Sequence, residues 1–233
     1  MEIDTTDLSI EEQVSRIVAA WARRHPEPVS FDYRLHQVVI GLFGRLCLGM
    51  RVEGAQRVPM AGGLIVAANH KSYLDPPLIG AAIPREIHYL AKRELFEMPV
   101  LKHWVRTHNA IPVRRSGFDR AALQECLRIL GRGGATLVFP EGTRILRHAL
   151  GEPREGAAWL AVRARVPVLP VLLRGTWAGE RRWFRPGGLR IRIGDPFLPP
   201  PAPPGPRDRG HLARVAEGIL HRIAALETNT DSA

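Results

Sequence analysis

Short apolar runs alternate with helical patterns along the chain from residue 50 onward. Six of these runs have the length and composition of buried strands, at residues 64–68, 87–91, 110–113, 136–139, 168–173 and 189–193. Apolar residues at helical spacing predict helices between them, over residues 76–83, 95–105, 119–130 and 155–165. Strands that are apolar on both faces and alternate with helices indicate an α/β fold, with a mostly parallel central sheet flanked by helices.

Two amphipathic helices are predicted before this region. Residues 9–24 begin with a capping box formed by Ser9 and Glu12, and they end at a His-Pro-Glu-Pro sequence because proline cannot continue a helix. Residues 33–50 carry the stronger pattern, with one apolar stripe made of Leu35, Val38, Val39, Leu42, Phe43, Leu46 and Met50. Two interpretations of this stripe stay open. It packs on the protein core, or it lies in a membrane interface with the helix arginines at anionic headgroups.

The C-terminal part of the chain begins with a proline-rich strap at residues 196–206 and continues as a helix. That helix has one apolar face, formed by Leu212, Val215, Ile219, Ile223 and Leu226. No internal repeat is present. We therefore predict three parts: N-terminal amphipathic helices on a membrane surface over 1–50, a central α/β domain over 51–195, and the strap with its C-terminal helix over 196–233.

The 233-residue chain has a formal net charge of +10, which favours an anionic partner such as nucleic acid, a membrane surface or a phosphorylated substrate. Its two cysteines, Cys47 and Cys126, form no disulfide framework, and no residues stand at metal-ligand spacing, so no metal or cofactor is expected. The longest uncharged apolar stretch stops at Arg45, far short of the ~20 residues of a spanning helix. The acidic N-terminus lacks the features of a secretory signal. We expect a reduced, cytosolic chain that lies on a bilayer if it meets one.

The first candidate site is the segment 69–75, which reads Asn-His-Lys-Ser-Tyr-Leu-Asp and precedes two prolines. Because proline is favoured at the first helical position, we expect a helix to begin at Pro76 with Asp75 as its N-cap. The loop is then free to bring the Asp75 carboxylate onto the His70 imidazole, which leaves the other ring nitrogen basic. No Gly-x-Ser-x-Gly motif supplies a nucleophile, so the pair suits deprotonation of a substrate hydroxyl. A satisfied turn histidine beside an ordinary N-cap is the alternative.

Two further segments place functional side chains after predicted strands. The first ends in Arg114 and Arg115, whose planar guanidiniums match phosphate in a bidentate geometry. The second turns sharply at Pro-Glu-Gly, where the glycine permits a positive φ or the close approach of a ligand. It presents Glu141, Gly142, Thr143 and Arg144. Each segment, taken alone, also fits an ordinary solvated turn.

In their order and residue sequence, these segments resemble the motifs of the lysophosphatidic acid acyltransferase family, the 1-acyl-glycerol-3-phosphate acyltransferases of phospholipid synthesis. The matching motifs are Asn-His-x-x-x-x-Asp at 69–75, Asn-Ala-Ile-Pro-Val-Arg-Arg at 109–115, Phe-Pro-Glu-Gly-Thr-Arg at 139–144 and Val-Pro-x-x-Pro-Val at 166–171. The resemblance covers residues 52–176 and makes 51–195 an acyltransferase domain.

The resemblance implies direct transfer of a fatty acyl group from acyl-CoA or acyl carrier protein to the free hydroxyl of lysophosphatidic acid, giving phosphatidic acid. By similarity, His70 is the general base and Asp75 orients it. The residues that the resemblance assigns to substrate binding are Arg115, Glu141, Gly142, Thr143 and Arg144. It implies no metal or prosthetic group. A lipid acceptor and a chain without a spanning segment together favour a peripheral, monotopic location on an anionic surface, at the cytoplasmic face of the membrane.

Three features depart from the family pattern. Asn109 replaces a glycine, Arg114 stands where an acid or a lysine is frequent, and the loop after Arg144 lacks the usual Lys-x-Gly, for which Arg154 and Gly156 are the candidates. Relatives with other acceptors, such as glycerol-3-phosphate, a lyso-ornithine lipid or another lysophospholipid, would share the catalytic half of the site.

Two other classes compete with this interpretation. A basic nucleic-acid-binding protein is suggested by the net charge and by Arg-Arg-Trp-Phe-Arg at 181–185, but no nucleic-acid-binding motif appears and no such partner is expected. The same cluster suits anionic lipid headgroups. A catalytically silent lipid-binding module is disfavoured because His70, Asp75 and Arg144 are all present.

Overall fold

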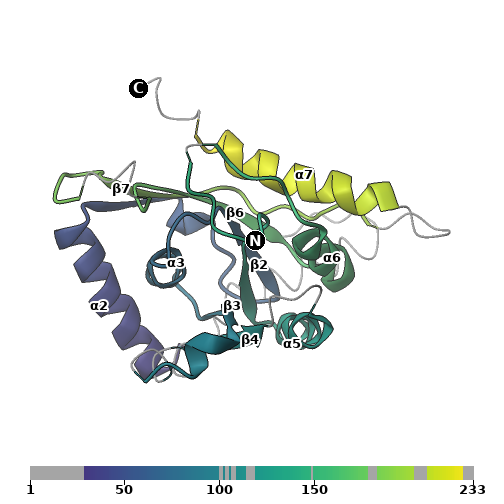
Figure 1. Ribbon diagram of the computed structural model, residues 1–233, viewed down its shortest axis with the longest axis horizontal. Helices are drawn as coiled ribbons and strands as arrows, with labels where there is room; N and C mark the ends of the chain where they lie inside the picture. The colour runs from purple at the N-terminus through teal and green to yellow at the C-terminus, as the bar shows by residue number, and fades with distance from the viewer. Residues whose placement is uncertain are drawn as a thin grey trace, which may run out of the picture.

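A seven-stranded sheet forms the centre of the molecule, with the strand order β1-β7-β6-β2-β5-β3-β4 (Figure 1). The computed structural model describes residues 29–99, 102, 105, 109–113, 119–147, 149–177, 183–201 and 209–227. Within these residues, neighbouring strands run parallel, except that β6 and β7 are antiparallel. The predicted α/β fold with a mostly parallel sheet is confirmed. The strands are β1 (Met50–Glu53), β2 (Leu64–Ala68), β3 (Ile87–Lys92), β4 (Ala110–Val113), β5 (Ala135–Val138), β6 (Val168–Arg174) and β7 (Leu189–Ile193).

Helices cover both faces of this sheet. They are α2 (Phe31–Cys47), α3 (Asp75–Ala82), α5 (Arg120–Gly131), α6 (Glu155–Ala164) and α7 (Arg209–Ala225). Side chains alternate between the two faces of a strand, and β2 shows the consequence. Leu64 and Val66 lie in one core cluster with residues of α2 and α3, whereas Ile65 and Ala67 lie in a second cluster with residues of α5, α6 and α7. The sheet is therefore the middle layer of three, as Figure 1 shows.

The strand predictions hold closely, and one strand is missed. The six predicted strands are all present, and none of their ends differs from the prediction by more than one residue. Met50 continues the apolar spacing of the preceding helix, so the prediction over 33–50 assigned it to that helix, and this was wrong. The helix ends at Cys47, Gly49 has a φ of +63°, and Met50 begins β1 beside Leu189 of β7.

Other predictions fall partly outside the described residues. The helix predicted at 9–24 and the strap residues 202–208 lie outside them. Of the helix predicted at 95–105, the structure describes residues 95–99, 102 and 105. The first two belong to the short 3₁₀ helix η2 (Arg93–Phe96), and residues 102 and 105 are helical. The described start of the strap pairs with the sheet, because Phe197 and Val168 exchange backbone hydrogen bonds of 3.0 and 2.8 Å. This bridge fixes residues 197–198 at the edge of the sheet where β6 begins.

Candidate active site

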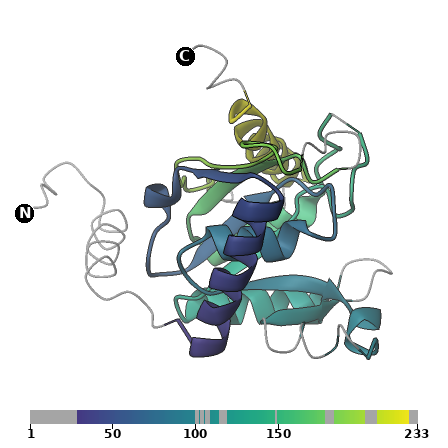
Figure 2. The ribbon, with the colours of Figure 1, turned by 90° about the vertical axis from the view of Figure 1, so that its left-hand side faces the viewer.

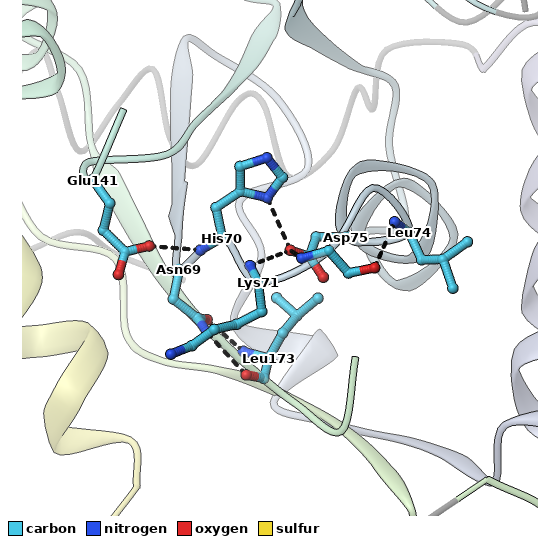
Figure 3. A network of polar contacts seen from close by, with 8 residues as sticks. Asn69, His70, Lys71, Leu74, Asp75, Glu141 and Leu173 are labelled. Atoms are coloured by element: carbon cyan, nitrogen blue, oxygen red, sulfur yellow. Dashed lines mark hydrogen bonds and ion pairs between the residues drawn. The ribbon is translucent and has the colours of Figure 1, made fainter. Parts of the chain in front are cut away.

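His70 and Asp75 form a hydrogen-bonded pair just beyond the C-terminal end of β2. The Nδ1 atom of His70 lies 2.9 Å from Oδ2 of Asp75, whose side chain is fully buried. A carboxylate can only accept hydrogen bonds, so Nδ1 carries the proton and Nε2 is left with its lone pair. Figure 3 shows the second ring nitrogen pointing away from Asp75. The pair predicted from the sequence is therefore assembled in the geometry that a general base requires.

Asp75 also holds the loop in which His70 lies. Its Oδ2 accepts hydrogen bonds from the backbone N–H groups of Lys71 and Ser72, at 2.6 and 2.7 Å. The residue is the first of α3, and Leu74 stands at the N-cap, so the expectation that Asp75 is the N-cap was wrong. Its carboxylate bonds to the loop before the helix instead of to the helix N-terminus. The buried Oδ1 has no hydrogen-bond partner among the described residues.

The imidazole of His70 is positioned from a second side by the 139–144 turn. The ring of Phe139 stacks on it, with 4.0 Å between centroids and 16° between planes. The Glu141 carboxylate accepts from the backbone N–H of His70 at 2.7 Å, as Figure 3 shows. The backbone N–H of Ile145 returns a bond of 2.8 Å to the carbonyl of His70. Contacts from the loop after β5 therefore fix both the backbone and the ring of the candidate base.

Glu141 lies inside this turn and does not face solvent. It is 2% exposed, and its two oxygens accept from the backbone N–H groups of His70 and Gly151, both at 2.7 Å. These bonds join the loop after β2 to the loop that leads into α6. The family resemblance assigned Glu141 to substrate binding. In the structure, both oxygens of its carboxylate are bonded to backbone N–H groups of the protein itself.

Asn69 and Lys71, the neighbours of His70, are both buried and hydrogen-bonded. The amide of Asn69 donates to the carbonyl of Leu173 and accepts from its N–H, at 3.0 and 2.7 Å, which ties the end of β2 to β6. The Lys71 ammonium donates to the carbonyls of Arg147 and Ala149, the latter at 2.8 Å. Each neighbour thus fastens the His70 segment to a different part of the fold.

Arg144 lies on the surface of the same turn, against Tyr73. Its guanidinium is 3.7 Å from the centre of the Tyr73 ring and donates a bond of 3.0 Å to the Tyr73 hydroxyl. Thr143 is exposed, and Gly142 has a φ of +64°, where an added Cβ would meet Cδ of Arg154 at 2.5 Å. Glycine is favoured here because of the positive φ, and any other side chain would also displace the Arg154 side chain. Arg115 lies outside the described residues.

A cleft of about 770 Å³ opens beside His70. His70, Tyr73, Gly142, Thr143 and Arg154 line it together with Lys92. The rest of the lining is largely apolar and comes from β3, β4, β5, η2 and α5, with side chains that include Leu90, Leu95, Val105, Val113, Leu123 and Leu137. The candidate base therefore meets both polar groups and a hydrocarbon-like surface, as reaction on an amphiphilic molecule would require. Among the described residues, no three His, Cys, Asp or Glu side chains form a group that could hold a metal ion.

Several residues of this site were not predicted from the sequence. No role was expected for Phe139, Lys71, Tyr73 or Lys92, although the first three lie inside the sequence motifs. The sequence indicated the first three only by their position within a motif. Contacts in the site join segments about 70 residues apart, as between Arg144 and Tyr73. Spacing along the chain does not reveal such contacts.

Comparisons with known proteins agree with the fold and with the family resemblance. A family model described as Acyltransferase matches residues 49–174. The chain is 27% identical to the 1-acyl-sn-glycerol-3-phosphate acyltransferase of Bacillus subtilis, over 84% of this chain and 94% of that protein. It is 30% identical to the mouse 1-acyl-sn-glycerol-3-phosphate acyltransferase alpha, over 82% of this chain and 69% of that protein. The crystal structure of the 1-acyl-sn-glycerophosphate acyltransferase PlsC from Thermotoga maritima superposes with a TM-score of 0.60 at 26% identity, covering 96% of this chain and 84% of that one.

Proposed function

The chain belongs to the acyltransferase family of the 1-acyl-sn-glycerol-3-phosphate acyltransferases, and on that premise we propose that it transfers a fatty acyl group to the free hydroxyl of lysophosphatidic acid, giving phosphatidic acid. The observation that carries the proposal is the contact between His70 and Asp75 at the edge of the cleft. Nearby side chains could bind a phosphate and a hydrocarbon chain.

The proposed reaction is a direct transfer in which His70 is the general base. Nε2 of His70 takes the proton of the acceptor hydroxyl as its oxygen attacks the thioester carbonyl carbon of the donor. The C–O bond forms, the C–S bond breaks, and the leaving thiolate takes the proton back from the imidazolium. The Asp75 carboxylate stabilises the imidazolium between these steps. Because the substrate brings its own hydroxyl, no enzyme nucleophile is needed, and the proposed reaction uses no metal ion or prosthetic group.

Different side chains in and near the cleft suit the two parts of the substrates. The apolar side chains from β3, β4 and α5 suit a fatty acyl chain, which gains free energy when it leaves water. Arg144 offers its planar guanidinium at the surface, where a lysophospholipid phosphate would bind in a bidentate geometry. We assign the same role to Arg115 from its motif. Gly142 and Thr143 line the cleft and directly precede Arg144 in the chain. We therefore assign them to binding of the acceptor as well.

The acyl donor of the proposed reaction is acyl-CoA or acyl carrier protein. Both carry the acyl group on a phosphopantetheine thioester, so the chemistry at His70 is the same for either. Lys92 and Arg154 line the cleft, and their positive charges suit a donor with phosphate groups. A relative with another acceptor, such as glycerol-3-phosphate or a lyso-ornithine lipid, would use the same base and the same cleft.

We further propose that the protein works as a peripheral protein on the cytoplasmic face of a membrane, bound through α2. The apolar stripe of this helix is exposed: the exposed fractions include 60% for Val38, 55% for Leu42 and 69% for Leu46. The opposite side of the helix holds the buried residues Tyr33 and His36 and packs on α3. This supports the interfacial interpretation of the stripe over the core one. Among the described residues, no helix is long and apolar enough to cross a membrane.

An acyl-transfer assay with the purified chain tests the proposal. One labelled acyl-CoA is offered with lysophosphatidic acid, glycerol-3-phosphate, a lyso-ornithine lipid or lysophosphatidylcholine, and each series is repeated with acyl carrier protein as the acyl carrier. We expect the highest kcat/KM with lysophosphatidic acid. Faster transfer to one of the other acceptors would reassign the substrate, and no transfer to any acceptor from either donor would overturn the proposed activity.

A further inference from the structure

We propose that the turn 183–188 forms a second membrane contact beside α2, in which Phe184 inserts between lipid headgroups and the surrounding arginines bind their phosphates. The occupant we assign to this surface is a bilayer that contains anionic phospholipid. The inference extends the membrane location proposed above from one helix to a surface that also fixes how the protein is oriented on the bilayer.

Phe184 is exposed and held in an unfavourable backbone conformation. Its exposed fraction is 78% and its φ is +64°, a left-handed conformation that a bulky side chain rarely adopts. The neighbouring Trp183 does the opposite, since it packs against the core and its indole N–H donates to the carbonyl of Gly175 at 3.1 Å. Trp183 therefore anchors the turn without Phe184. A strained, solvent-exposed aromatic side chain that does not serve the core suggests a role at the surface.

The turn is fastened to the C-terminal end of α2. The backbone N–H of Phe184 donates to the carbonyl of Cys47 at 3.1 Å, and that of Gly187 donates to Gly49 at 2.9 Å. Gly49 lies so close that an added Cβ would be 1.8 Å from the carbonyl oxygen of Arg185. Phe184 is thus held by its backbone one residue from Leu46, the most exposed member of the stripe on α2, and we infer that the two side chains belong to one apolar surface. Figure 2 shows α2 on the side of the molecule that faces the viewer.

This surface lies at the same edge of the sheet as His70. β6 and β7 are antiparallel, with Arg174 opposite Arg190, so β7 begins where β6 ends. β6 runs parallel to β2, whose C-terminal end leads into His70. The turn before β7 and the α2 end before β1 therefore lie at the edge where the candidate active site opens. A bilayer that contacts Phe184 would come close to the cleft from which a lipid acceptor enters.

Exposed arginines lie on the turn and on the elements joined to it. They are Arg45 in the last turn of α2, Arg51 on the edge strand β1, Arg185 in the turn and Arg190 on β7. In the part of the chain that the structure describes, none of these four side chains forms an ion pair. An exposed aromatic side chain, with unneutralised arginines on its own turn and on the neighbouring helix and strands, has the composition of a contact with an anionic membrane interface. This charge complementarity is the reason for assigning a bilayer and not a second copy of the same basic surface.

Flotation with lipid vesicles tests the proposal. The full chain and its variants are mixed with vesicles of phosphatidylcholine and phosphatidylglycerol in equal parts, or of phosphatidylcholine alone. Phe184→Gly removes the aromatic ring and suits the positive φ, so it should keep or raise the unfolding temperature while weakening binding to the anionic vesicles about tenfold. Phe184→Asn, which also tolerates this conformation, should do the same. Arg185→Gln combined with Arg190→Gln should weaken binding to the anionic vesicles and leave binding to phosphatidylcholine unchanged.

Matched controls come from the opposite end of the sheet, where β6 begins. Leu198 is 54% exposed and follows Phe197 at the edge where β6 begins, and Arg163 is an exposed arginine of α6. Leu198→Ser and Arg163→Gln should bind the vesicles as the wild type does. Unchanged binding by folded Phe184→Gly, or an equal loss in the two controls, would overturn the proposal. So would a wild-type dimer that Phe184→Gly dissociates without any change in vesicle binding, because the turn would then be a protein interface.

The outcome is separable from that of the proposed reaction. Acyl transfer to a detergent-dispersed acceptor needs no vesicle, so the Phe184 variants should retain it. If the wild type lacks acyl transfer but binds vesicles through Phe184, the reaction is wrong and the membrane surface stands. If acyl transfer is normal and no variant changes vesicle binding, the reaction stands and the membrane surface is wrong.

Discussion

One carboxylate oxygen, Oδ2 of Asp75, accepts three hydrogen bonds, from the imidazole of His70 and from the backbone N–H groups of Lys71 and Ser72. Two of these bonds set the shape of the loop and the third sets the tautomer of the ring. The same atom thus links the local fold to the chemistry. In the proposed reaction, its negative charge stabilises the imidazolium, because a charge in this largely buried position is costly without a counter-charge.

Asp75→Asn tests the charge separately from the geometry. An asparagine oxygen in the position of Oδ2 could still accept all three bonds while the imidazolium loses its counter-charge, but its NH2 group would then occupy the buried position of Oδ1, which has no partner among the described residues. We expect kcat to fall at least about a hundredfold and the free energy of unfolding to fall by about 1–3 kcal/mol. Steady-state kinetics and thermal unfolding of the same preparation check this. A variant that unfolds at a much lower temperature would instead show that the carboxylate serves mainly the loop.

Arg144→Lys tests the assignment of the acceptor phosphate. Lysine keeps the charge but loses the planar fork and its stacking on Tyr73. We expect the KM for lysophosphatidic acid to rise about tenfold, which corresponds to about 1.4 kcal/mol, with the KM for the acyl donor unchanged. Arg163→Lys on α6 is the matched control. An increase confined to the KM of the donor would assign Arg144 to the phosphates of the donor.

At the scale of single elements, the sequence predicted the sheet better than the orientation of the helices. Buried strands such as β2 are apolar on both faces, and this signal is local, so strand ends were predicted to within one residue. The face that α2 turns to the core could not be predicted. Its buried side combines Tyr33 and His36 with Gly41 and Gly44, while its most apolar side faces solvent. Gly80 of α3 lies against this side, where an added Cβ would be 3.2 Å from the Tyr33 hydroxyl, and hydrophobicity alone does not identify that face.

Tyr33→Phe tests which face of α2 stabilises the fold. The Tyr33 hydroxyl, whose pKa is raised far above its ordinary value of 10 because it is buried, accepts a bond of 3.2 Å from the backbone N–H of Ile87 at the start of β3. Removing the hydroxyl leaves that buried N–H unpaired, so we expect the free energy of unfolding to fall by about 1–3 kcal/mol. Leu42→Ala, on the exposed face of the same helix, should change it by no more than about 0.5 kcal/mol. Denaturant unfolding measures both, and the opposite ranking would contradict the packing of α2.

At the scale of the whole molecule, the ends of parallel strands gather the site. Segments 69–75 and 139–144 follow neighbouring strands, β2 and β5, and for that reason motifs far apart in the sequence meet at one edge. From the sequence, each segment was expected to follow a strand, and the family resemblance assigned His70, Asp75 and the Glu141 turn to one reaction. The sequence could not predict that Glu141 would bond to two backbone N–H groups, or that the ammonium of Lys71 would bond to carbonyls almost 80 residues later in the chain. Those bonds depend on the path of the connecting loops, which has no local signature.

The exposed stripe of α2 gives a prediction at this scale. Leu42→Glu combined with Phe43→Glu places two negative charges on a surface that contacts neither core cluster. We expect the double variant to lose binding to anionic vesicles in a flotation assay, because acidic side chains repel the headgroups and resist burial in lipid. Its thermal unfolding without lipid should match that of the wild type. Unfolding of this variant together with an absence of lipid binding by the wild type at low salt would show that the stripe belongs to a core.

The rate of acyl transfer by folded His70→Ala is the most direct test of the central claim. Wild type and variant are compared with lysophosphatidic acid and the same labelled acyl donor, and vesicle binding and thermal unfolding verify that the variant is intact. If Nε2 of His70 takes the proton of the acceptor hydroxyl, kcat should fall by about 10²–10⁴-fold while acceptor binding is retained. Near-normal turnover by the folded variant would contradict the proposed mechanism.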